Sequence, residues 1–192
     1  MKYQKEVIPV IPPKEIVIGD AAAKVKIVMF GDYESDACAK ATDVIAELLK
    51  QYEGKINFVF RHFPLTKIHQ KAHKAAEAAI GAAQEGKFWE MHQYIFGHRN
   101  NLGIISLKSY AREVGVIDKK YLDNLMNSYY GWFVQDDLRE GIEMGVTEVP
   151  TFFINDIRFE KEPTLKNLEA HIKDLLTKKI PGFSKAGEKK RA

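Results

Sequence analysis

One short stretch of the sequence carries residue types suited to sulfur chemistry. Ser35, Asp36 and Cys38 follow an apolar run, residues 27–30, and precede apolar residues spaced three and four apart. This pattern predicts a buried strand that leads into a helix over residues 35–52, with Cys38 in its first turn. Unpaired backbone N–H groups and the helix dipole favour negative charge at such a place. We therefore expect the Cys38 thiol to ionise more easily than a free thiol and to react as the thiolate.

Cys38 is the only cysteine among the 192 residues, which excludes an intramolecular disulfide. A cycle between dithiol and disulfide is excluded as well, because the second sulfur must displace the first from its partner. Two roles remain open for Cys38. It could form mixed disulfides or a sulfenic acid as a monothiol, or it could be a small buried residue of the core. The carboxylate of Asp36, two residues away, opposes a thiolate.

Ser35 also has two interpretations. Serine before an acidic residue of the first turn is the usual N-cap of a helix, which favours a structural role. A serine hydroxyl can also donate a hydrogen bond to a thiolate, and this would make Ser35 part of the reacting site.

The remaining pattern predicts a mixed α/β chain with a long helical segment. Residues 56–61 form a second strand, parallel to the first because a helix connects them. Residues 69–140 read as short helices, with Ser106 and Asp118 as caps, and residues 151–160 as a hairpin before a helix that starts after Thr164. We predict an N-terminal arm at 1–18, an α/β domain at 19–68 and 145–180, an inserted helical subdomain at 69–144, and a disordered basic tail at 181–192.

Charge, hydropathy and cysteine content limit the partners and the location that we expect. The net charge is +3, and part of it lies in the terminal tail, so no nucleic-acid partner is expected. No apolar run approaches the length of a membrane span, so no membrane insertion is expected. The first residues lack the apolar core of a secretory signal, and a single cysteine suits a reducing compartment, so we expect a cytoplasmic protein. A periplasmic or secreted protein would fit equally if a signal had been removed.

Three stretches together resemble the DsbA-like thiol–disulfide oxidoreductase family. Residues 28–40 are similar to the strand of that family and the start of its Cys-x-x-Cys helix. The second stretch is residues 61–65 with His69 and the alanine-rich helix, followed by residues 86–89. Residues 145–155 are similar to the family's cis-proline loop. The resemblance spans roughly residues 18–178 in the family's order. It implies a thioredoxin-like α/β fold with an all-helical insertion.

The sequence departs from that family at one decisive position. Where the family has its first, nucleophilic cysteine, this chain has Ser35, and only the second cysteine remains as Cys38. A cysteine-to-serine exchange made by experiment would look the same, although Asp36 favours natural divergence. The resemblance implies an oxidoreductase-like protein whose dithiol activity is impaired or lost. Ser35 and Cys38 would do the chemistry, and Asp36, Val149 and a cis Pro150 would contact the substrate.

The resemblance implies a thiol- or disulfide-containing protein or peptide, or glutathione, as partner, and no resident cofactor. Two other functions stay open: a non-catalytic module that binds a peptide beside Pro150, and a glutathione-dependent transferase or isomerase. The second rests on a further resemblance, since kappa-class glutathione transferases and hydroxychromene carboxylate isomerases place a serine at this helix start. His62, His69 and His73 are predicted to pack rather than to bind a metal.

Overall fold

The computed structural model describes residues 10–177, so the predicted tail and the first nine residues of the predicted arm lie outside the described residues. The chain builds one five-stranded sheet in the order β1-β3-β2-β4-β5. The central strands β2 and β3 pair in parallel, as predicted, and the other neighbours pair antiparallel. The strands are β1 (Val17–Gly19), β2 (Val25–Gly31), β3 (Ile56–His62), β4 (Thr151–Ile154) and β5 (Ile157–Arg158).

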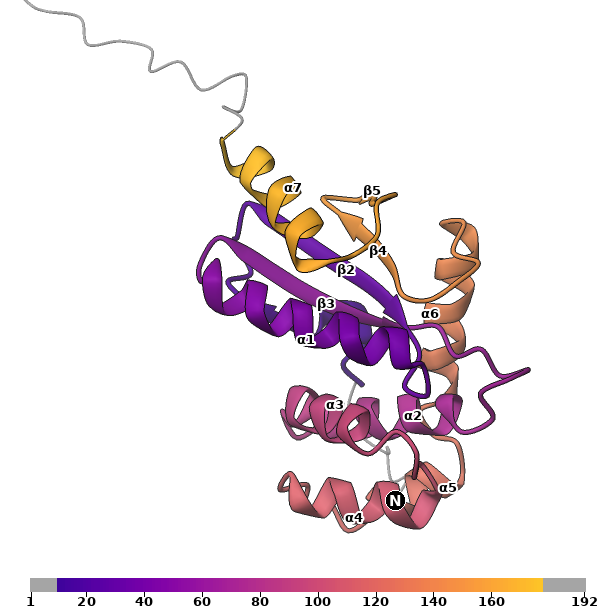
Figure 1. Ribbon diagram of the computed structural model, residues 1–192. Coiled ribbons are helices and arrows are strands. Elements are labelled where there is room, and N and C mark those ends of the chain that lie inside the picture. Colours follow the sequence, from indigo (N-terminus) through magenta and orange to yellow (C-terminus); the bar gives the residue numbers. More distant parts are fainter. Residues whose placement is uncertain (1–9, 178–192) are drawn as a thin grey trace, which may run out of the picture.

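Both faces of the sheet are covered, which explains why β2 and β3 are apolar throughout. Ile27 and Met29 on one face belong to the main core, which they share with α1 and α7. Val28 and Phe30 on the other face belong to a second core beside α6. Figure 1 shows α1 and α7 against the sheet and α6 beside it. The long helices of the α/β half are α1 (Asp36–Gln51) and α7 (Leu165–Thr177).

The segment between β3 and β4 is helical, and most of it packs at one end of the molecule, as Figure 1 shows. Its alanine-rich helix α2 is almost wholly buried, because α3, α4, α5 and α6 all contact it. Small side chains allow this close packing on every side. The helices are α2 (Ala72–Ala83), α3 (Phe88–Gly97), α4 (Ile104–Glu113), α5 (Tyr121–Met126) and α6 (Gly131–Glu143).

Several predicted helix boundaries in this segment are wrong. Helix α2 begins at Ala72 rather than His69, because the His69 ring is held by a carboxylate of a neighbouring loop. Helix α4 begins at Ile104, two residues before the predicted cap Ser106. The Asp118 carboxylate accepts the N–H of Lys120 in the turn before α5, so it does not cap that helix. A 3-10 turn at Pro13–Glu15 was not predicted.

Gly141 on α6 allows this helix to lie close to the sheet. A Cβ atom at residue 141 would lie 2.7 Å from a ring carbon of Phe63 and 3.1 Å from one of Phe30. Any larger side chain would force α6 away from the second core. The same helix carries the acidic partners of Arg61, so its position matters beyond packing.

Within residues 10–177, no helix combines the length and apolar character that a bilayer crossing requires.

Candidate functional site

The start of α1 is fixed by Ser35. Its backbone is extended, and its Oγ accepts the N–H of Cys38 at 3.2 Å, so Ser35 is the N-cap of α1. Ser35 is itself buried, with 8% of its surface exposed. The Ser35 oxygen therefore caps the helix as an acceptor. Its O–H can still donate a hydrogen bond, for example to a sulfur atom.

The structure contradicts the expectation that Cys38 ionises easily. The side chain is fully buried in the main core. Burial raises the pKa of the Cys38 thiol to about 11, against the opposing effects of Ser35 and of the Asp32 N–H, which donates to Sγ at 3.4 Å. Removal of the thiol from water raises its pKa by more than the start of the helix lowers it, so Cys38 is a neutral thiol at pH 7.

Asp32 is a buried carboxylate that organises the loops around α1. Its Oδ1 accepts the N–H of Glu34, and its Oδ2 accepts the N–H of Leu65 and contacts Nδ1 of His69 at 2.9 Å. The side chain is wholly inaccessible. Asp32 thus holds the loop before Ser35 against the segment after β3. It lies beside Cys38 and has a structural role there.

Asp36 lies at the surface and faces the helical insertion. Its Oδ1 accepts the Nε–H of Arg99 at 2.6 Å. The hydrogen bond and the charge of Arg99 lower the pKa of Asp36. The pair links the first turn of α1 to the loop after α3, and Asp36 does not line the groove described next.

A groove of about 540 Å³ runs along the first turns of α1. Ala37, Ala41 and Val44 of α1 form one side. Val149 and Pro150, joined by a cis peptide bond, form the other side with the loop before α7. The structure therefore brings the start of α1 to the Val149–Pro150 loop, 112 residues later in the sequence. Ser35 and Cys38 are buried in the same first turn of α1 and do not line the groove.

The three histidines near the sheet edge each contact other side chains. His62 is fully buried between aromatic rings, His69 contacts Asp32, and Nε2 of His73 lies 3.0 Å from the Gln135 amide. Across the part of the chain that the structure describes, no three histidine, cysteine, aspartate or glutamate side chains form a group suited to a metal ion.

Sequence reasoning missed Asp32, Arg99 and the charged rim of the groove, Lys40, Glu148 and Glu162. Asp32 carried a usable signal, because a carboxylate between a buried strand and a helix start must find donors nearby. Arg99 carried none, since its partner is 63 residues away.

Comparison with known proteins agrees with this architecture. The family profile described as Thioredoxin matches residues 12–174. A Na(+)/H(+) antiporter, NhaA 3 of Salinispora tropica, is 32% identical over 165 residues, covering 86% of this chain and 25% of the antiporter. NhaA 1 of Mycobacterium sp. strain KMS is 34% identical over 153 residues, again 25% of its length. The chain thus spans about a quarter of these relatives, whose names describe whole proteins.

Solved structures share the fold at low sequence identity. BdbD from Bacillus subtilis, in its oxidised form, superposes with a TM-score of 0.76 at 22% identity, covering 86% of this chain and 92% of that one. The thiol-disulfide exchange protein alpha-DsbA2 from Wolbachia pipientis gives 0.71 at 21% identity, covering 83% and 86%. The fold is therefore DsbA-like, with a helical insertion in a thioredoxin-like α/β body. With the profile match across most of its length, this chain belongs to the thioredoxin family.

Proposed function

We propose that this chain is a divergent DsbA-like oxidoreductase-family protein that binds a thiol- or disulfide-bearing polypeptide and has no dithiol cycle. The observation that carries the proposal is the groove between α1 and Pro150, which is lined by the first turns of a helix whose start holds one sulfur instead of two. The binding surface of a thiol–disulfide exchange protein is kept, and the second redox atom is absent. Cys38 then contributes at most monothiol chemistry.

The lining of the groove supports an extended polypeptide as the occupant. Most lining side chains are apolar, which suits the side chains of an extended segment. The charged lining groups are Lys40, Glu148 and Glu162, one cation and two carboxylates. Glutathione also carries two carboxylates and one ammonium group. Its net negative charge would meet the net negative charge of the groove, which disfavours binding. A polypeptide with a neutral or basic flank is the better match.

Monothiol chemistry at Cys38 would be slow. Its thiolate would attack a partner disulfide, one S–S bond would form as the other breaks, and the partner would leave as a thiolate that takes up a proton. A pKa of about 11 leaves only about one thiol in ten thousand ionised at pH 7. The attacking atom is also buried, so the α1 start must open first. We therefore infer that binding, rather than covalent capture, is the main activity.

A binding experiment tests the groove. The probe is a fluorescent, extended peptide of apolar residues around one cysteine, offered as the free thiol and as a disulfide with a small thiol. Ala37 is exposed and lines the groove, so Ala37→Trp would place a large side chain in it. Ala46 is exposed on the same helix and does not line the groove, so Ala46→Trp is the matched control. We expect Ala37→Trp to weaken binding at least tenfold and Ala46→Trp to leave it unchanged. Equal binding by both variants would contradict the proposal.

A second measurement separates the three chemistries. Native protein treated with oxidised glutathione is weighed by mass spectrometry. A stoichiometric adduct on Cys38 would support monothiol catalysis, whereas an unmodified protein whose Cys38→Ala variant still binds the peptide supports a non-catalytic module. Retention on immobilised glutathione that is lost in Ser35→Ala would instead support a glutathione-dependent enzyme.

The sequence left two locations open, the cytoplasm and, if a signal had been removed, the periplasm or the outside of the cell. The fold shared with thiol-disulfide exchange proteins favours the second, and the cytoplasmic location remains a proposal. It is supported by the cysteine count, because a protein without a disulfide needs no oxidising compartment. Fractionation of the source cells with an antibody against the chain tests it, and recovery outside the cytoplasm would overturn it.

A further inference from the structure

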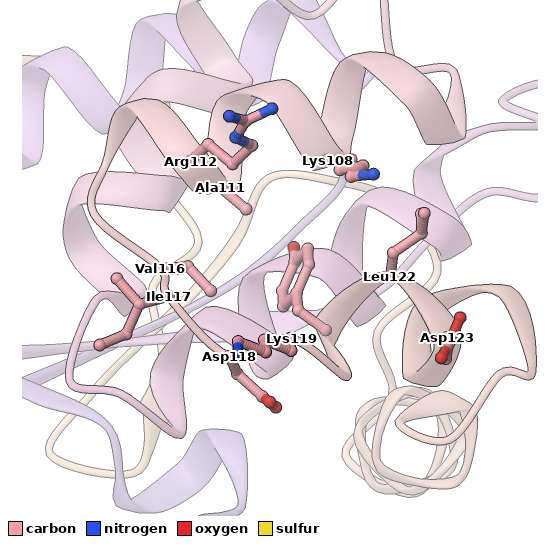
Figure 2. A pocket seen from close by; sticks show the side chains of 10 residues that line it. Lys108, Ala111, Arg112, Val116, Ile117, Asp118, Lys119, Leu122 and Asp123 are labelled. Carbon is pink, nitrogen blue, oxygen red and sulfur yellow. The ribbon is translucent and has the colours of Figure 1, made fainter.

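A cleft in the helical insertion has no part in the function proposed above. It lies between α4 and α5 and has a volume of about 470 Å³, and we call it the α4–α5 cleft. Figure 2 shows the side chains that line it, which come from α4, from the loop at residues 116–119 and from α5. The insertion that contains it lies at the opposite end of the molecule from α7, as Figure 1 shows.

The floor of the cleft is apolar. Ala111, Val116 and Tyr121 are buried there, and Leu122 is half-buried. The Tyr121 hydroxyl points inward and donates to the carbonyl of Ala78 at 2.9 Å. Its ring therefore lines the cleft without a polar atom that would prefer water. The floor can thus accept apolar side chains from a partner.

The rim carries three cations, Lys108, Arg112 and Lys119. None of the three forms an ion pair within residues 10–177. The rim also carries two carboxylates, Asp118 and Asp123. Three cations against two carboxylates leave a net positive charge, which favours an acidic partner.

Exposed isoleucines flank these cations. Ile117 is 84% exposed beside the cleft, and Ile105 on α4 is 72% exposed. Ile105, Lys108 and Arg112 are spaced three and four residues apart, so they share one face of α4. This face of α4 carries one exposed isoleucine followed by two cations, which matches an amphipathic segment with leucines and glutamates on one side.

We propose that the α4–α5 cleft docks an acidic, amphipathic segment of a partner protein. Its apolar side chains lie on the Ala111, Val116 and Leu122 floor, and its carboxylates pair with Lys108, Arg112 and Lys119. This contact does not depend on the groove at Pro150 and would persist if that groove bound nothing. The chain would then hold a partner at the insertion while leaving the separate groove at Pro150 free.

The test uses the full chain, labelled with ¹⁵N, and a synthetic helical peptide of leucines and glutamates as the probe. A peptide with lysine in place of glutamate, a single-stranded DNA and phosphatidylglycerol vesicles serve as competing classes. Lys108→Glu/Arg112→Glu reverses two rim charges. Lys55→Glu/Lys166→Glu makes the same charge change on exposed residues of the α/β half and is the matched control. Melting curves of both double variants show whether they fold.

We expect the acidic peptide to shift amide signals of α4 and α5, with affinity that falls as salt is raised. The rim variant should bind at least tenfold more weakly, and the control should bind like the parent. Three results would overturn the proposal: no binding of the acidic peptide, signals that move elsewhere, or equal binding of the lysine peptide. Preference for DNA or vesicles would overturn it too, because the cleft would then be a general anion surface.

Discussion

At the residue scale, the chemistry of Cys38 is decided by competition between a helix start and burial. Charge near a helix end is stabilised by about 0.3–1 kcal/mol, which corresponds to less than one pKa unit. Desolvation of a fully buried group shifts a pKa by several units in the opposite direction. The complete burial of Cys38 therefore determines its state. A helix position alone is a weak basis for assigning a reactive thiol.

The raised pKa of Cys38 predicts a loss of stability at high pH. The folded chain holds the thiol proton up to about pH 11, whereas the unfolded chain releases it near pH 9. The protonated thiol therefore contributes fully to the free energy of unfolding below pH 9, and this contribution is lost as pH rises to about 11. A difference of two pKa units corresponds to about 3 kcal/mol. Urea unfolding of the parent and of Cys38→Ala across this range measures it. Parallel pH curves for the two proteins would contradict the burial of the thiol.

The sequence was sufficient for some residue roles and not for others. The cap formed by Ser35 and the exclusion of a dithiol cycle follow from residue types and spacing alone. The pairing of Asp36 with Arg99 depends on how the insertion docks, which no local pattern encodes. The burial of Cys38 depends on the same packing.

At the element scale, α6 is tied to β3 by a buried ion pair. Nε of Arg61 donates to Asp137 Oδ1 at 2.6 Å, and the backbone N–H of His62 donates to Asp137 Oδ2. Arg61 also donates to Glu140 at 2.7 Å. Burial raises the pKa of Asp137 to about 6, and its donors keep it ionised at neutral pH. The arrangement fixes α6 against the end of β3.

Removal of the cation is expected to be strongly destabilising. Arg61→Met leaves the buried Asp137 carboxylate unpaired, which should lower the free energy of unfolding by about 3–5 kcal/mol. Arg61→Met/Asp137→Asn should recover much of this loss, because Asn keeps an acceptor for the His62 N–H without the charge. Arg139→Met, at an exposed ion pair, should change stability by less than about 1 kcal/mol. Urea unfolding at pH 7 measures all three, and equal losses for Arg61→Met and Arg139→Met would refute the interpretation.

Buried His62 predicts a loss of stability on the acid side. Among residues 10–177, neither ring nitrogen has a hydrogen-bond partner. Desolvation, with nearby His92 and Arg61, lowers the pKa of His62 well below 6.5. The unfolded chain binds this proton and the folded chain does not, so stability falls as pH drops below about 6.5, by about 2 kcal/mol at pH 5.

The matched comparison is His62→Phe against His98→Gln. Phenylalanine suits the surrounding rings of Tyr33, Phe60 and Phe88 and removes the titrating group. His98 is exposed, so its replacement should leave the acid loss in place. If unfolding curves at pH 5 and pH 7.5 show the same loss for His62→Phe as for the parent, His62 is not the cause.

Element types were more predictable than element boundaries. The apolar runs of β2 and β3 and the periodicity of α1 predict a parallel βαβ unit, and the structure contains it. The short helices of the insertion were harder, because their ends lack side-chain caps. Tertiary contacts such as the one between His69 and Asp32 set where they begin.

At the scale of the whole molecule, the chain is a thioredoxin-family body with two separate surfaces. The groove at Pro150 belongs to the α/β half, and the α4–α5 cleft belongs to the insertion. The fold could be anticipated because three motifs resembled the family in the correct order. The cleft could not be anticipated, because Lys108, Arg112 and Leu122 line one surface only when α4 and α5 lie side by side.

We propose that this chain keeps the frame of a DsbA-like oxidoreductase and lacks one of its two sulfur atoms. The most direct test is Ser35→Cys, assayed beside the parent chain for reduction of a protein disulfide with a thiol reductant present. A cysteine at this N-cap would lie one helical turn before Cys38, where the pair could form an intramolecular disulfide. We predict no turnover by the parent and clear turnover by Ser35→Cys, abolished again in Ser35→Cys/Cys38→Ala. Turnover by the parent, or none by a folded Ser35→Cys, would contradict the claim.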